Sequence, residues 1–469
     1  MRTGWLGLAF GYALTAAAAN DGGPLRDLDW GAVPEDNGIA YIAFDVGGSL
    51  DDRADAAALQ PDGNLLIGGS ATTAGGTEAA LARLLPSHSE LDLGFGTGGR
   101  LVLETSNAGS ISDVAVLPDG RIVYGTSLSE STIAIGRLLA DGTPDTSFDF
   151  DGRRAIAANA FVPLGSAIGS PKILLQPDGK IIVFTGASAS LPDIQVYAVA
   201  TRLDSDGSTD TTFGGEGTGY GRYAPINGTT PVAQGSAIAR LPNGQLLGSG
   251  IGYHAGGSGV DMLTFRLSAD GVLDTAYGID GFGFVAFDQG GSLDDYLTAI
   301  AIDRQGRAVV TGNFIDVNGT TRMALARLTA SGQLDATFGI GGRVLHEIRH
   351  AAVWEYGNAV AVLPDGRILV AGASALCACG GQGDAGTLTM FATNGDVNRF
   401  FGVNGTERFG SENGPDAEVL PIAHMLVSGD YAYLTGWAHK PGPSNQEFAT
   451  ARVIVPLFRG GFEEAEEAP

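Results

Sequence analysis

The sequence predicts an all-β fold, a seven-bladed β-propeller. A turn motif recurs at a near-constant spacing, each copy contains four short strand patterns, and no long helical pattern is present. The spacings between successive turn glycines are 57, 59, 65, 62, 60 and 63 residues, which indicates one supersecondary unit copied seven times. The motif, Leu/Gln-Pro-Asp/Asn-Gly, ends at Gly63, Gly120, Gly179, Gly244 and Gly366, and degraded forms end at Gly306 and Gly429.

The first two strands of each copy are predicted as a β-hairpin around this turn. In the second copy, alternating small and apolar residues over 112–117 precede Pro118-Asp119-Gly120, and a run rich in β-forming residues over 121–124 follows. Short β-rich runs on both sides of a Pro-Asp-Gly turn are typical of a hairpin, and glycine supplies the positive φ that the turn requires.

A second block, Ala/Gly-Arg-Leu, a turn and then Asp-x-x-Phe-Gly, predicts the third strand, and a Gly-rich turn then leads to a fourth strand, as in 100–104 and 281–287. Because the Arg and Asp recur in nearly every copy, we interpret them as structural pairs within or between blades rather than as an active site. The arginines are Arg83, Arg137, Arg202, Arg266, Arg327 and Arg452, and the aspartates are Asp92, Asp145, Asp210, Asp274 and Asp335. The aromatics are Phe95, Phe148, Phe213, Tyr277 and Phe338, and the sixth copy has Met390, Asn398 and Phe401 at these three places.

Four-stranded units repeated around an axis form a β-propeller. The first strand is traced to 38–44, so the repeats are expected to span residues 38–455. A parallel β-solenoid is the competing repeat fold. It is disfavoured because solenoid coils usually have about 20–30 residues and because these turns favour antiparallel hairpins.

The hairpin-turn motif and the Arg-Leu…Asp-x-x-Phe-Gly motif together resemble the bacterial delta-60 repeat. The resemblance is clearest at residues 117–123 and 324–339. The resemblance covers most of the chain and several spaced positions in each copy. It implies an extracellular or envelope-associated bacterial repeat protein, and it supplies no catalytic motif for transfer to this chain.

The two ends of the chain differ from the repeats. Residues 1–19, a short positive start followed by an apolar run and Ala17-Ala18-Ala19, are predicted to be a secretory signal peptide. Residues 20–37 are expected to be a linker, and the acidic residues 456–469 a disordered tail. No later run of twenty apolar residues exists, so no transmembrane span is expected, and the protein is expected to be secreted or envelope-associated.

The net charge of −25, with only three lysines, argues against a nucleic-acid partner because no basic stripe is present to displace counterions. An acidic surface is most simply a means of solubility. Cys377 and Cys379 are the only cysteines, and they leave two states open, a strained local disulfide after export or a pair of free thiols.

One segment matches a zinc-protease pattern. His346-Glu347-Ile348-Arg349-His350 fits H-E-x-x-H, in which two histidines one helical turn apart share a metal. Here the segment is predicted to continue a strand, where positions four apart are separated by roughly 13 Å and do not converge on one ion. We therefore assign no metal residue, although a helix at 344–356 would favour a zinc site.

Two runs of aspartates occur in predicted turns, Asp204, Asp206 and Asp210 in one and Asp145, Asp149 and Asp151 in the other. Alternating carboxylates suit calcium, but neither run has the spacing of an EF-hand loop. Asx-turns explain the same residues, so calcium is kept only as an alternative and no cofactor is assigned.

The functional hypothesis is an exported, non-catalytic, monomeric scaffold that binds a protein or glycan through loops on one propeller face. The alternative is a hydrolase or lyase with a site in the central channel. A tight group of ionisable side chains near the axis that includes a histidine or paired glutamates would count against the scaffold and favour the enzyme. No catalytic residue is assigned, and the loops expected to bind are 127–131, 188–197, 253–261, 374–386 and 439–447.

Overall fold

The computed structural model describes residues 27, 30, 38–44, 46, 51–86, 90–103, 109–162, 167–189, 195–215, 217–227, 230–231, 233–253, 259–287, 294–348, 354–375, 385–409, 421–439 and 446–455. Within these residues, every regular element is a β-strand except a 3-10 turn at Ala158–Ala160. The all-β prediction is therefore confirmed. No helix in the described part of the chain is long and apolar enough to cross a membrane.

Groups of four consecutive strands form antiparallel sheets, and each group is called a unit and named after its first strand. The β2 unit contains β2 (Arg53–Leu59), β3 (Leu65–Thr73), β4 (Gly76–Leu84) and β5 (Arg100–Leu103). The β6 unit contains β6 (Ile111–Val116), β7 (Ile122–Ser129), β8 (Thr132–Leu138) and β9 (Arg153–Ala157). The β17 unit contains β17 (Ala233–Arg240), β18 (Leu246–Tyr253), β19 (Val260–Leu267) and β20 (Phe282–Val285).

Two further regions depart from this simple pattern. In the β11 unit, both β10 (Ala167–Ile168) and β11 (Lys172–Leu175) pair with β12 (Ile181–Ala189), which is followed by β13 (Gln195–Leu203) and β14 (Tyr220–Tyr223). A two-stranded hairpin of β15 (Ile226–Asn227) and β16 (Thr230–Pro231) then leads to the β17 unit.

One parallel pairing, Thr321 with Trp354, joins the next two units into an eight-stranded sheet. The β21 unit contains β21 (Asp295–Ile302), β22 (Ala308–Ile315), β23 (Thr321–Leu328) and β24 (Arg343–Leu345). The β25 unit contains β25 (Trp354–Val362), β26 (Ile368–Ala375), β27 (Ala385–Phe391) and β28 (Thr406–Phe409).

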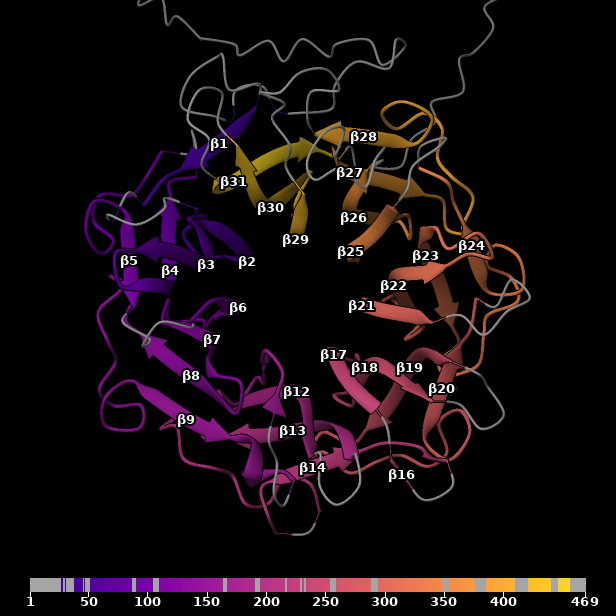
Figure 1. Ribbon diagram of the computed structural model, residues 1–469, viewed down its shortest axis with the longest axis horizontal. Helices are drawn as coiled ribbons and strands as arrows, with labels where there is room; N and C mark the ends of the chain where they lie inside the picture. The colour runs from indigo at the N-terminus through magenta and orange to yellow at the C-terminus, as the bar shows by residue number, and fades with distance from the viewer. Residues whose placement is uncertain are drawn as a thin grey trace, which may run out of the picture.

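The units are arranged in a ring in chain order, with β2, β6, β17, β21, β25 and β29 nearest the axis (Figure 1). The β29 unit contains β29 (Ile422–Ser428), β30 (Tyr431–His439), β31 (Gln446–Ile454) and, as its outer strand, β1 (Ile39–Ile42). Ile39 pairs with Ala451 in this sheet. The strand predicted at 38–44 therefore exists, but it completes the last sheet of the ring and joins the two ends of the repeat region.

The predicted hairpin turns are confirmed at each of the turn glycines in the sequence. Gly120 has φ of 87° and donates its N–H to the carbonyl oxygen of Leu117 at 2.9 Å. The degraded turns behave alike, since Gly306 has φ of 74° and donates to Asp303 at 3.0 Å, and Gly429 has φ of 58°.

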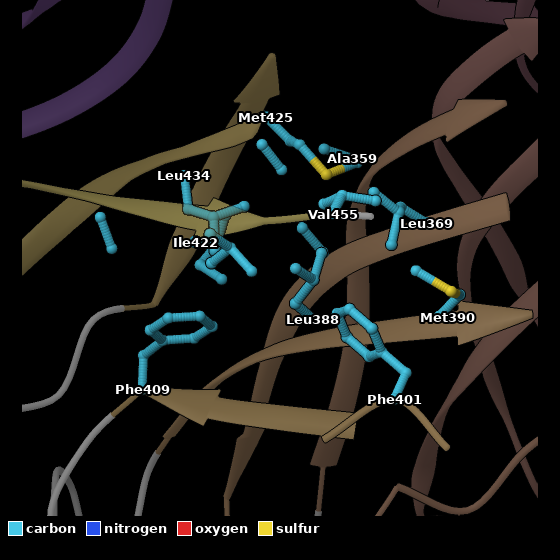
Figure 2. Packing of buried hydrophobic residues seen from close by; sticks show 14 of the residues in the cluster. Ala359, Leu369, Leu388, Met390, Phe401, Phe409, Ile422, Met425, Leu434 and Val455 are labelled. Atoms are coloured by element: carbon cyan, nitrogen blue, oxygen red, sulfur yellow. The ribbon is translucent and has the colours of Figure 1, made fainter. Parts of the chain in front are cut away.

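The hydrophobic core lies between neighbouring units. Figure 2 shows one such interface, where Leu369, Leu388 and Phe409 of the β25 unit face Ile422 and Leu434 of the β29 unit. All five side chains are buried. Because each unit buries both faces against its neighbours, small and branched apolar residues dominate the strands.

Candidate functional site

The recurring arginine is an architectural group that links one unit to the next. In β8, Nε of Arg137 donates to Oδ2 of Asp145 at 2.7 Å, and the guanidinium lies over the Phe148 ring, 4.8 Å from its centroid. Nη1 of Arg137 also donates to the carbonyl oxygen of Ser205, in a turn of the following unit. The pairing predicted from the sequence is thus confirmed, and it acts both within and between units.

The same link recurs around the ring. Arg202, Arg266 and Arg327 pair with Asp210, Asp274 and Asp335 of their own units and lie over Phe213, Tyr277 and Phe338. The next-unit acceptors are the carbonyls of Ala140 for Arg83, Ala269 for Arg202, Ala330 for Arg266 and Thr393 for Arg327. In the sixth copy, where Met390 replaces the arginine, Asn398 and Arg367 each approach the Met390 sulfur at 3.3 Å.

The last arginine takes its partners from the start of the chain. Nε of Arg452 donates to Oδ2 of Asp27 at 2.8 Å, and its guanidinium lies 4.5 Å from the Trp30 ring centroid. The backbone N–H of Asp27 donates to the carbonyl of Arg452, as that of Asp145 does to Arg137. Two residues of the segment predicted as a linker, 20–37, therefore supply the missing Asp-x-x-aromatic motif of the last unit.

The aspartates weighed as calcium ligands are occupied by neighbouring side chains and backbone. Burial would raise the pKa of Asp145, but hydrogen bonds from Ser147 and Arg137 outweigh it and hold the pKa at about 2. Asp204 and Asp210 both contact the Lys180 ammonium, at 3.0 and 2.6 Å. Among the described residues, no three His, Cys, Asp or Glu side chains are grouped as metal ligands. Calcium binding remains an untested alternative.

The H-E-x-x-H segment is described only in part. The strand β24 ends at Leu345, so the described residues 346–348 form neither the expected strand nor a helix. His346 packs edge-on against Phe391, and Glu347 lies 3.8 Å from Arg322. Burial lowers the pKa of His346. His350, Cys377 and Cys379 lie outside the described residues, so the predictions about them stay predictions.

The predicted binding loops all connect the second and third strands of their units: β7–β8, β12–β13, β18–β19, β26–β27 and β30–β31. The Pro-Asp-Gly turns and the Asp-x-x-Phe segments connect strands at the opposite ends. Neighbouring units share this orientation, because Gln60 in one turn donates to the carbonyl of Gly120 in the next at 3.3 Å. We call the two sides the loop face and the turn face. Residues 190–194, 254–258, 376–384 and 440–445 of the loops lie outside the described residues.

Ionisable residues gather on one side of the ring axis, a set that the sequence analysis did not identify. Most innermost strands contain a β-bulge, and the residue after it is Asp113 in β6 and His424 in β29. Lys172 in β11 occupies the equivalent place, seven residues before its turn glycine, as Asp113 does. With Asp55, the bulge residue of β2, these side chains are named the axial arc.

The axial arc is half-buried and electrostatically coupled. Nζ of Lys172 donates to the carbonyl of Ser112 at 2.9 Å, and Oδ2 of Asp113 accepts the N–H of Ile173 at 2.7 Å. Burial raises the pKa values of Asp55 and Asp113, an effect that the positive charge of Lys172 opposes. Burial lowers the pKa of His424 to about 4, and the same charge adds to this shift, so the imidazole is neutral at pH 7.

Alignment of the copies on their turn glycines would have shown part of this set. The position seven residues before the glycine holds Ala56, Ala237, Ala299 and Ala359 in four copies, but Asp113 and Lys172 in two. His424 escapes such an alignment because its turn is two residues shorter. The replacement of alanine by a charged residue at this position could thus be read from the sequence. The location of these residues beside the ring axis was known only from the structure.

Four segments of the chain match the model of one protein family. The family is described as "Domain of unknown function (DUF5122) beta-propeller", and the segments are residues 60–95, 117–148, 176–213 and 306–338. Each segment runs from a hairpin turn to the aromatic residue of the next Asp-x-x-Phe motif. The match therefore supports a β-propeller repeat fold. Among curated proteins, none matches the chain.

Several solved structures are similar at low identity. Polysaccharide lyase Uly1 is 9% identical with a TM-score of 0.48, covering 86% of this chain and 90% of that one. A protein of unknown function from Dyadobacter fermentans is 11% identical, with a TM-score of 0.43 and coverage of 89% and 100%. The C-terminal domain of PilY1 from Pseudomonas aeruginosa is 10% identical, with a TM-score of 0.44 and coverage of 82% and 92%. At these identities, no activity passes from those proteins to this chain.

Proposed function

We propose that this chain is an exported, seven-bladed propeller of delta-60 repeats that binds a protein or glycan through its loop face, as a monomer and without catalysis. The separation of the two faces is the observation that carries the proposal. The turn face is built from the same residues in copy after copy, whereas the connections on the loop face differ in length and composition. Variable loops on a rigid frame are where binding residues usually lie.

The strand pairings support the proposed count of seven blades. The innermost strands β2, β6, β11, β17, β21, β25 and β29 each begin one unit, and β1 supplies the fourth strand of the last unit. Seven units are also what the seven turn glycines predict. Export rests on the predicted signal peptide, 1–19, and a monomer is the simplest state for a ring whose ends are joined.

The test is capture of a partner from envelope and culture-medium fractions with the full chain as bait. One variant replaces residues 254–259, between Tyr253 of β18 and Val260 of β19, with Asn-Gly, a turn that closes a hairpin. A matched control, Gln333→Ala, changes an exposed side chain on the turn face. The proposal predicts a partner that the loop variant loses and the control keeps. Equal capture by both variants, or no partner in either fraction, would count against it.

The second candidate is a hydrolase or lyase that uses the axial arc. The observation in its favour is His424, a neutral imidazole on which the Lys172 ammonium acts electrostatically, as it does on the carboxylates of Asp55 and Asp113. This enzyme predicts release of products from a panel of polysaccharides and loss of that activity in His424→Ala. A zinc version at His346, Glu347 and His350 predicts one bound zinc per chain, measured on the same sample.

A further inference from the structure

The axial arc breaks the repeat symmetry on one side of the ring only. At the position after the bulge, β6, β11 and β29 have ionisable residues, whereas the other units have alanine: Ala56, Ala237, Ala299 and Ala359. The β2 unit has its ionisable residue, Asp55, at the bulge itself, where β17, β21 and β25 have the uncharged Ser236, Thr298 and Asn358. The ionisable residues belong to β29, β2, β6 and β11, which are consecutive neighbours around the ring. A role in the architecture of each unit would require the same residue in every unit, as the arginine link shows. A contiguous exception therefore points to a ligand.

Within the part of the chain that the structure describes, some polar groups of the arc have donors or acceptors to spare. Lys172 has three N–H donors, of which the Ser112 carbonyl takes one. Nδ1 of His424 is buried and has no hydrogen-bond partner among the described residues. Asp55 accepts from the Ser110 hydroxyl at 2.8 Å through one oxygen, and Arg53 lies 3.7 Å from the other. The arc thus offers acceptors, donors and an imidazole that serves as either.

The arc lies where a ligand from the loop face would enter. Asp55, Asp113 and His424 are each the third residue of their innermost strands. These strands begin at the loop face and run towards the turn face, so the arc is nearer the loop-face end of the axis. All four side chains are half-buried, and the Asp55 side chain retains 29% of its accessible surface.

We infer that the axial arc is a binding site for a neutral sugar, held through its hydroxyl groups. A hydroxyl both donates and accepts, so it matches carboxylate, ammonium and neutral imidazole partners on one wall. An anionic sugar would meet two carboxylates on a chain of net charge −25, and a cation would meet Lys172. A lipid chain would leave the charged groups unpaired. This inference is independent of the loop-face partner.

The test is saturation-transfer NMR and calorimetry on the folded chain. The probes are glucose, galactose, mannose, xylose and arabinose with their disaccharides, alongside galacturonate and calcium chloride. At least one neutral sugar should bind, and His424→Ala and Lys172→Ala should each weaken it about tenfold, as expected when a hydrogen bond to a buried or charged group is lost. Ser236→Ala, at the bulge of β17 and outside the arc, is the matched control and should leave the affinity within about twofold.

Three outcomes would overturn the inference: no neutral sugar binds, galacturonate or calcium binds in their place, or the His424 and Lys172 variants bind as well as Ser236→Ala. If His424→Ala fails to fold, His424→Gln preserves the volume and is used instead. The loop variant at 254–259 leaves the arc intact. Loss of the sugar site and loss of the loop-face partner are therefore distinguishable.

Discussion

A single guanidinium group explains most of the recurring polar residues of this chain. Arg137 is almost fully buried, and a buried charge is tolerated only when it is paired and hydrogen-bonded. Asp145 neutralises it, Phe148 covers one face, and a carbonyl of the next unit takes another donor. The sequence predicted the pairing because Arg and Asp recur at a fixed separation. The carbonyl acceptor was not predictable, because any residue type supplies one.

Replacement of Arg137 should therefore be costly. Arg137→Ala removes one partner of a buried pair and is expected to lower the free energy of unfolding by about 3 kcal/mol. Arg121 contacts the same carboxylate at 3.4 Å but is 32% exposed, so Arg121→Ala should cost less than about 1 kcal/mol. Urea unfolding of both variants measures the difference. Equal losses would show that Arg137 is not the main partner of Asp145.

The aspartates of these links should make the fold sensitive to acid. Burial would raise the pKa of Asp335, but hydrogen bonds from Thr337 and Arg327 hold it at about 2, as at Asp145. The folded pKa lies below the unfolded value of about 3.9. Each group therefore stabilises the fold above about pH 4, by about 2 kcal/mol, and loses this as the pH falls to about 2. Urea unfolding across this pH range measures the loss, which should be smaller in Asp145→Asn.

At the scale of elements, the turns of one unit are fitted to the aromatic residue of the unit before it. Gly271 has φ of 78°, and a Cβ there would lie 2.4 Å from the Phe213 ring. Gly142, Gly332 and Gly395 stand in the same relation to Phe95, Tyr277 and Phe338. A glycine in these turns is thus required by close approach as well as by backbone conformation.

Two glycines separate these two requirements. Gly120 has φ of 87°, and the atom nearest to an added Cβ would be Cβ of Ala140, at 3.6 Å. Because this distance is an ordinary contact, Gly120→Ala should lower the free energy of unfolding by about 1 kcal/mol from backbone strain alone. Gly271→Ala adds overlap with the Phe213 ring and should cost about 2 kcal/mol more. Thermal and urea unfolding of the two variants give the comparison. Equal destabilisation would show that the ring moves aside without penalty.

The hairpins were predictable because their signals are local, with a Pro-Asp-Gly turn between two β-rich runs. The β-bulges were not, because the extra residue, such as Ser112 in β6, carries no sequence signature. The axial arc depends on those bulges, so its residues looked like isolated members of apolar strands. His424 illustrates the limit, since the position seven residues before its turn glycine is Ile422 and the histidine stands two residues later.

At the scale of the molecule, the ring is joined by contacts between residues far apart in the sequence. Arg452 and Asp27 are 425 residues apart, and β1 pairs with β31. Asp27 and Trp30 carry the Asp-x-x-aromatic spacing, but they stand before the first turn motif, where no copy was expected. The repeating unit was thus predictable from the sequence. That residues near the start of the chain complete the last unit became clear only in the structure.

This closure should contribute much of the stability of the ring. Trp30 is 1% exposed and packs edge-on against Tyr433, with ring centroids 5.7 Å apart. Trp30→Ala is expected to cost about 3–5 kcal/mol, as for other buried aromatics, because it leaves a cavity where the ends of the chain meet. Phe400→Ala is the matched control: this ring is fully exposed, so its loss should change stability by less than about 0.5 kcal/mol. Hydrogen exchange would then show faster opening of β1 and β31 in Trp30→Ala than in the wild type. Unchanged exchange in β1 and β31 would mean that strand pairing alone holds the ring closed.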